Sequence, residues 1–161
     1  MSIRSRLHGL IYNQSVSSGA FDCNIQIDIN RFARNLDAAE YWLANEILQN
    51  SNDFVPFREG TLRESGHVID TDEGYRIEWS TPYAHYLYEG VLYVNPQHNA
   101  SGWMDKYGQW HGWPGEKTPT EKHLEYHTEG TSDHWIDEAK KAYMSHWIKG
   151  TRRVAGGHDA G

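Results

Sequence analysis

The chain has 161 residues, enough for one domain with a hydrophobic core, and a formal net charge of −7 at pH 7. This acidic balance argues against a surface built to grip duplex DNA, because phosphate binding needs clustered lysine and arginine. A single cysteine, Cys23, excludes an intrachain disulfide and a cysteine-based zinc site.

Residues 1–23 are predicted to form an N-terminal arm. They combine serine and glycine with only a short apolar patch at Leu10–Tyr12, a composition typical of loops. The arm either reaches a neighbouring molecule or is a frayed end. The stretch Leu7–Tyr12 is too short for the apolar region of a secretory signal and contains His8 and Gly9. No apolar run in the chain reaches the roughly 18–20 residues that a membrane-spanning helix needs.

A strand and a long helix are expected next, and they open a single domain over residues 24–150. Asn24–Ile29 alternates isoleucine with polar residues, which predicts a half-buried strand. Asn30 is placed to cap a helix from about Arg31 to Gln49. An apolar stripe along this helix, which packs on a sheet or on a partner helix, is formed by Phe32, Leu36, Ala39, Leu43 and Ile47.

The segment Phe54–Ser65 reads as a sharp corner between that helix and a following strand. Val55 precedes Pro56 and is therefore pushed toward extended geometry, and Gly60 can adopt a positive φ. Thr61–Glu64 has the form of a capping box that would start a short helical turn.

A hairpin and a second corner follow. The segments 67–70 and 75–80 flank a linker containing Asp and Gly, which predicts a β-hairpin. One face of its second strand would carry Tyr75, Ile77 and Trp79. In the second corner Thr81 can cap a short helix that Gly90 ends, and Val91–Val94 returns as a strand.

Residues 95–130 differ from the rest because they have almost no periodicity, yet they hold four histidines and several tryptophans. Disordered linkers avoid large aromatic residues, so this segment is interpreted as an inserted arm or β-extension that orders against a neighbouring subunit. Asp133 then caps a final helix from about His134 to Lys149, Gly150 ends it, and residues 151–161 form a flexible tail. The apolar stripe of this last helix consists of Ile136, Ala139, Tyr143 and Trp147.

These elements predict an α+β fold. Its small, mostly antiparallel sheet would have the long helix and the C-terminal helix packed on one face, plus the inserted arm rich in Trp and His.

The two corners, with a hairpin between them, resemble the minor capsid or tail-completion proteins of the neck, or head–tail connector, of long-tailed bacteriophages. The first corner contributes Val55, Pro56, Gly60, Leu62, Arg63 and Ser65. The second contributes Pro82, Tyr83, Ala84, Tyr86 and Gly90. The helix from Trp135 to Trp147 resembles the family's closing helix, so the likeness covers about residues 30–95 and 130–150.

The resemblance implies a structural virion protein and not an enzyme. It would be made in the host bacterial cytoplasm and would need no cofactor. It would form a ring, expected to be a hexamer, that completes and joins head and tail, like a tail terminator. Its partners would be copies of itself and the adjoining head-connector and tail-tube proteins, with DNA passing through without specific binding and no membrane contact.

Eight residues are candidates for subunit contacts. Arginines of the first corner can pair with carboxylates across a subunit boundary or, within the chain, with Glu59 or Glu64. Tyrosines of the second corner can be core residues, corner residues or interface anchors, and the tryptophans of the arm suit interfaces. The candidates are Arg58, Arg63, Tyr83, Tyr86, Tyr88, Trp103, Trp110 and Trp113.

Two other classes of function stay open. His123 and His127 are four residues apart and would share one face of a helix, as in a zinc-dependent hydrolase, but no third ligand is evident. A carbohydrate-binding module would instead use the arm tryptophans as stacking platforms. The sequence lacks phosphate-binding glycine motifs, and Asp22 beside Cys23 disfavours a reactive thiolate.

Overall fold

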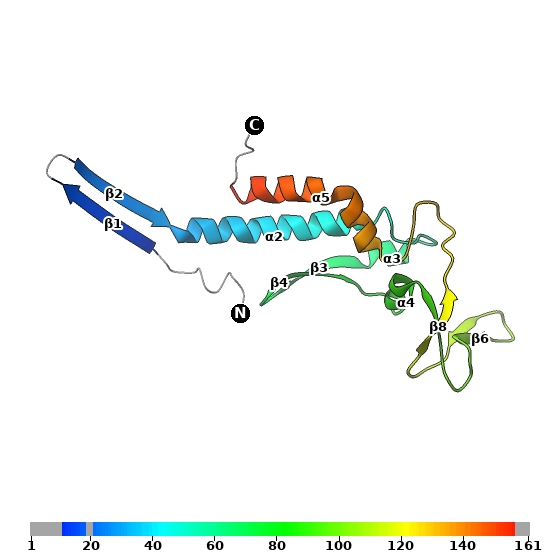
Figure 1. Cartoon of the computed structure of the whole chain (residues 1–161). Coiled ribbons are helices and arrows are strands. Elements are labelled where there is room, and N and C mark those ends of the chain that lie inside the picture. The colour runs from blue at the N-terminus through cyan, green and yellow to red at the C-terminus, as the bar shows by residue number, and fades with distance from the viewer. Residues whose placement is uncertain (1–10, 19–20, 157–161) are drawn as a thin grey trace. The chain divides into compact units, whose positions relative to one another are not determined.

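The computed structural model describes residues 11–18 and 21–156 and confirms the α+β class (Figure 1). Its helices are α2 (Ile29–Ser51), α3 (Thr61–Glu64), α4 (Ala84–Glu89) and α5 (Trp135–Val154). Its strands are β1 (Ile11–Ser18), β2 (Phe21–Asp28), β3 (Gly66–Thr71), β4 (Gly74–Trp79), β5 (Val91–Val94), β6 (Gly102–Met104), β7 (Trp110–Gly112) and β8 (Thr118–His123).

The described chain divides into two compact units. The first contains residues up to 49, residues 67–78 and those from 142 onward, and the second contains residues 50–66 and 79–141. In place of the one small sheet expected, the strands form four two-stranded sheets, which pair β1 with β2, β3 with β4, β5 with β8, and β6 with β7.

The first unit begins with an antiparallel hairpin of β1 and β2, paired from Ile11 opposite Asp28 to Ser18 opposite Phe21. The predicted strand at 24–29 is confirmed over residues 24–28, which belong to β2, whereas Ile29 is the first residue of α2. The prediction of a loop-like arm over 1–23 is wrong for residues 11–18 and 21–23, and residues 1–10 lie outside the described part. Serine-rich segments can form strands when a partner strand satisfies their backbone N–H and C=O groups, and composition alone does not reveal that partner.

Helix α2 contacts the β3–β4 hairpin within the first unit. The Tyr41 ring lies 5.2 Å from the Tyr75 ring, and the Tyr75 hydroxyl donates to Asp37 Oδ1 at 3.4 Å. The helix begins at Ile29, so Asn30 lies inside it and is not its cap. Of the predicted stripe, Ala39 is buried and Leu36, Leu43 and Ile47 are half-buried, but Phe32 is 54% exposed and does not belong to the core.

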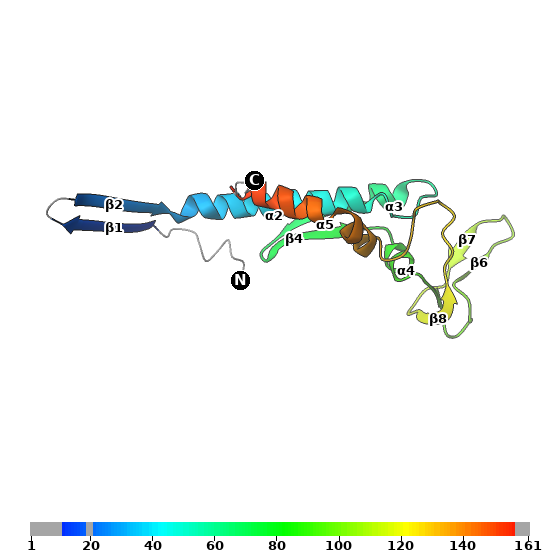
Figure 2. The ribbon, with the colours of Figure 1, turned by 45° about the horizontal axis from the view of Figure 1, so that its top comes forward.

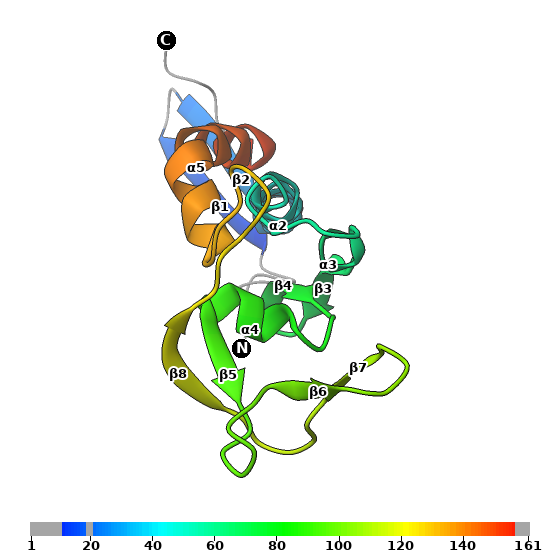
Figure 3. The same ribbon diagram turned by 90° about the vertical axis from the view of Figure 1, so that its right-hand side faces the viewer.

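The C-terminal part of α5 packs on a different side of α2. The two helices lie next to each other in Figure 1, α5 lies in front of α2 in Figure 2, and Figure 3 shows α2 end-on. The Trp42 ring lies 5.9 Å from the His146 ring, whose Nε2–H donates to Glu46 Oε2 at 3.0 Å. A Cβ atom on Gly150 would fall inside the Trp42 ring. Gly150 therefore leaves room for that ring in mid-helix and does not end α5.

Helix α5 accordingly runs from Trp135 to Val154, which corrects the predicted bounds at both ends. His134 has a positive φ of 43° and precedes the helix. The expected flexible tail is helical at 151–154, and residues 157–161 lie outside the described part.

The core of the second unit is built around Trp135, whose side chain is almost completely buried beside Val55, Leu62 and Ala84. The Trp79 ring meets it edge-on at 5.6 Å, and the Tyr88 ring at 4.8 Å. Burial of three large rings at one point fixes the two corners against the start of α5, because aromatic side chains bury the most apolar area per residue.

Gly60 adopts the predicted positive φ, at 86°, and Gly90 ends α4 as predicted, in the left-handed conformation with φ of 69°. The predicted side-chain caps are wrong. Thr61 is the first residue of α3, Thr81 lies three residues before α4, and neither helix has a capping side-chain hydrogen bond among the described residues. Gly60 and Tyr83 occupy the N-cap positions instead.

The segment 95–130 contains regular strands, which fits the β-extension alternative. β5 pairs antiparallel with β8, with Val91 opposite His123 and Val94 opposite Thr118. β6 pairs antiparallel with β7, with Gly102 opposite Gly112 and Met104 opposite Trp110. Both pairings stay within the second unit and project the β6–β7 hairpin from it.

Candidate interaction surface

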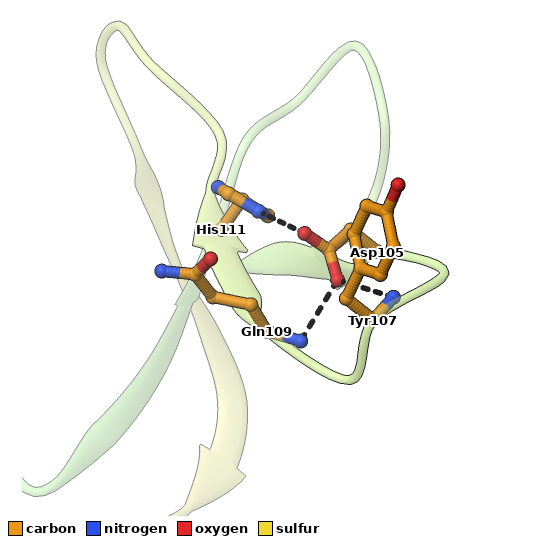
Figure 4. A network of polar contacts seen from close by, with 4 residues as sticks. All are labelled: Asp105, Tyr107, Gln109 and His111. Atoms are coloured by element: carbon orange, nitrogen blue, oxygen red, sulfur yellow. Dashed lines mark hydrogen bonds and ion pairs between the residues drawn. The ribbon is translucent and has the colours of Figure 1, made fainter.

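The turn of the β6–β7 hairpin is fixed by one carboxylate. Asp105 Oδ1 accepts hydrogen bonds from the backbone N–H groups of Tyr107 at 2.8 Å and Gln109 at 2.9 Å (Figure 4). The Asp105 N–H donates to the Gln109 carbonyl at 2.9 Å, and Gly108 supplies the positive φ of 79° that the turn needs. The Gly108 N–H also donates to the Asp105 carbonyl at 3.1 Å, so four hydrogen bonds hold the backbone of the hairpin tip.

The second oxygen of the same carboxylate ties the tip to strand β7. His111 Nε2–H donates to Asp105 Oδ2 at 2.9 Å. This bond, together with the amide donors of Gln109 and Tyr107, holds the pKa of the Asp105 carboxyl below its usual range, although desolvation opposes them. Asp105 therefore stays ionised and keeps its four-residue network at neutral pH.

A row of stacked rings supports the base of the hairpin. The His98 ring stacks on Trp113 with centroids 3.6 Å apart and an interplanar angle of 8°. Trp113 lies 4.2 Å from Trp103, and Trp103 stacks on His111 at 5.2 Å. The rings of Trp103 and Trp113 contact each other, and each also stacks on a histidine ring. These contacts favour a packed aromatic cluster over separate tryptophan platforms on which sugar rings could stack.

Outside this cluster the hairpin exposes large apolar side chains. Tyr107 is 82% exposed, Met104 59% and Trp110 56%, and Trp103 is also exposed. We call these four residues the arm surface. Exposed apolar side chains gathered on one rigid element mark protein–protein contact sites more often than isolated ones do.

A cavity of about 570 Å³ lies at the two corners of the second unit. Residues 56–62 form one wall, Tyr83 and Leu87 a second, and residues 125–128 a third. The rings of Phe57 and Tyr83 are exposed toward solvent. We call it the corner cavity, and its size falls in the range of protein ligand sites.

Hydrogen bonds hold the walls of the corner cavity. The Arg63 guanidinium donates from Nε and Nη2 to the Val55 carbonyl at 3.0 and 2.8 Å, and it lies 5.0 Å from the centre of the Phe57 ring. Tyr126 donates its hydroxyl proton to the Leu87 carbonyl at 2.6 Å. Burial, with a smaller contribution from the Asp133 carboxylate, raises the pKa of Tyr126 to about 12.

The structure separates the eight candidate contact residues into three groups. Trp103, Trp110 and Trp113 come together in the hairpin, and Arg58 and Tyr83 line the corner cavity. The remaining three are engaged inside the chain and are Arg63, Tyr86 and Tyr88.

The two internal tyrosines have distinct partners. The Tyr86 ring lies 4.9 Å from Tyr93, and the Lys117 ammonium lies 5.2 Å from its centre. Tyr88 packs on Trp135, and burial, followed by the carboxylates of Asp137 and Glu89, raises its pKa.

Sequence reasoning missed the polar and aromatic groups that shape the hairpin: Asp105, Tyr107, His98 and His111. A signal was present, because Asp105–Gly108 has an Asx-turn pattern between aromatic residues, which is typical of a hairpin loop. This pattern was overlooked because the surrounding segment, residues 95–130, is rich in histidine and has almost no periodicity.

The helical histidine pair predicted for a metal site does not form. His123 is the last residue of β8, and His127 lies in a segment without helix or strand. Among the described residues, no cluster of three or more His, Cys, Asp or Glu side chains has an arrangement suited to a metal ion. Within the same residues, no helix combines the length and the apolar character needed to cross a bilayer.

Comparison with known proteins gives one match. The family model described as minor capsid protein matches residues 23–106, just over half of the 161-residue chain. This span includes both corners and all of β6. No curated protein and no solved structure matches the chain.

Proposed function

We propose that this chain, which belongs to the minor capsid protein family of bacteriophages, forms a ring in the phage neck that completes and joins head and tail. Family membership makes it a structural component of the virion. We further propose that the protein forms a ring, that this ring lies in the neck, and that the protein is made in the host cytoplasm. The chain then works by assembly and has no reaction to catalyse.

The proposal rests on the arm surface, a group of exposed apolar side chains on a hairpin whose turn is fixed by hydrogen bonds. Tyr107, Met104 and Trp110 are each more than half exposed, while Asp105 fixes the turn between them. Leaving such side chains in water forfeits about 1.5–3 kcal/mol each, so covering them against other subunits is favourable. A prearranged turn also lowers the entropy lost on contact.

A ring follows from the way identical subunits associate. When one patch contacts a different patch on the next copy, the contacts close into a ring if the rotation between copies closes. Six copies are expected, with head-connector and tail-tube proteins as neighbours. The net charge of −7 fits a channel wall that DNA slides past without specific binding.

Deleting the gene and complementing it with variants tests this proposal. The deletion should leave DNA-filled heads and separate tails in the lysate by negative-stain electron microscopy. The wild-type gene should restore infectivity, as should Met104→Leu, whereas Met104→Asp should fail because a charge enters an apolar contact. Losing one side chain that contributes about 2 kcal/mol to binding raises the Kd of each subunit contact roughly 30-fold.

Two outcomes would contradict the proposal. One is joined, infectious particles from the deletion strain. The other is full complementation by Met104→Asp, which would show that the arm surface is not used in assembly.

A further inference from the structure

We propose that the hairpin tip of one copy, Lys106–Tyr107, inserts into the corner cavity of the next copy. This inference rests on the proposed function and deepens it by naming the two surfaces that meet when the ring closes. The tip supplies a protruding ring and a cation, and the cavity supplies exposed rings and carboxylates.

The tip has the form of an anchor. Tyr107 is 82% exposed, the largest value among the exposed apolar side chains of the described residues. Its backbone N–H is held by Asp105 at 2.8 Å, so the ring projects from a fixed point. Tyrosine gives large contact area with few rotatable bonds, which is why it is favoured at the centre of interfaces.

The corner cavity has matching chemistry. The rings of Phe57 and Tyr83 line it and are exposed, and they offer apolar surface to an incoming aromatic ring. Its lining also carries two carboxylates, Glu59 and Glu125, against one guanidinium. This excess of negative charge is complementary to the ammonium of Lys106, which is exposed beside Tyr107.

The tip and the cavity of one chain do not meet. Both belong to the second unit, yet the lining consists of residues 56–62, 83, 87 and 125–128, and none of these belongs to the hairpin. Each copy therefore presents a protrusion and a separate cavity. Two different patches that are complementary to each other make a head-to-tail contact, the type that closes rings.

The test is cross-linking in purified virions. The native Cys23 is replaced by serine, and cysteines are placed at two exposed positions beside the proposed contact, Gln109 on the tip and Thr61 on the cavity wall. Virions carrying Gln109→Cys and Thr61→Cys together are treated with a short bismaleimide and run on a denaturing gel. The controls are virions with either cysteine alone.

A ladder of dimer, trimer and higher species in the double variant, absent from both single variants, is the expected result. Adding Tyr107→Ala should abolish the ladder, whereas Tyr107→Phe should retain it. Monomer alone, with several copies of the chain present per virion, would overturn the inference and leave the proposed function standing. Cross-links from a single variant to another virion protein would also overturn it, because the occupant would then not be a second copy. Virions that lack the chain would contradict the proposed function itself.

Discussion

The substitution Gly150→Ala separates two accounts of the C-terminal helix. If Gly150 faced solvent within the helix, alanine would be tolerated or would stabilise the protein, because alanine is the better helix former. In the structure, Gly150 lies within α5 and a Cβ atom there would enter the Trp42 ring. The substitution therefore tests whether α2 and α5 approach each other at this residue.

The expected magnitude follows from two opposing effects. Alanine in a helix interior is favoured over glycine by about 1 kcal/mol. Forcing an extra carbon into a packed contact costs about 1–3 kcal/mol, and a rigid indole ring places this case at the upper end. We expect the free energy of unfolding to fall by about 2 kcal/mol, or roughly 4–8 °C in Tm for a chain of this length.

Urea unfolding of the purified protein, followed by far-UV circular dichroism, measures this change. Ser145→Ala, at an exposed position on the same helix, is the matched control and should stay within about 0.5 kcal/mol of wild type. In a Trp42→Leu background the cost of Gly150→Ala should largely disappear, because the smaller side chain frees the space. A higher urea midpoint for Gly150→Ala alone would refute the packing of α5 on α2.

Three further predictions concern the second unit. Arg63→Lys removes the paired hydrogen bonds to the Val55 carbonyl and should lower the free energy of unfolding by about 1–2 kcal/mol in urea titrations; an unchanged midpoint would contradict this role. Tyr126 should ionise with a pKa of about 12 in ultraviolet titration. Since that pKa lies above the unfolded value of roughly 10, its contribution to stability is complete below pH 10 and is lost as pH rises toward 12, and Tyr126→Phe should remove this loss. Asp105, whose pKa is lowered chiefly by the hydrogen bond from His111, should stabilise the fold above pH of roughly 4 and lose this effect as pH falls below it. A carboxyl titration by NMR with an ordinary pKa for Asp105, or the same acid sensitivity in Asp105→Asn, would argue against the network.

Local patterns predicted the elements whose geometry depends on neighbouring residues. The alternation of Tyr75, Ile77 and Trp79 with charged residues predicted the half-buried face of β4. The positive φ of Gly60 and the end of α4 at Gly90 were likewise predicted from the places of these glycines in the corners. These features follow from side-chain alternation and from backbone sterics, and both can be read within a few residues.

The features that sequence reasoning missed depend on distant partners. β8 has the sequence Thr-Pro-Thr-Glu-Lys-His, without an apolar face, and becomes a strand because β5 pairs with it from 24 or more residues away. Gly150 resembles a helix stop until the Trp42 ring is placed against it. Long-range pairing of this kind outweighs local propensity.

A cryo-electron-microscopy reconstruction of the neck in intact virions tests the central claim most directly. The account predicts a closed ring at the head–tail joint, formed by several copies of this chain, with the β6–β7 hairpin of each copy in contact with the next. A neck without this chain, or with one isolated copy, would contradict it.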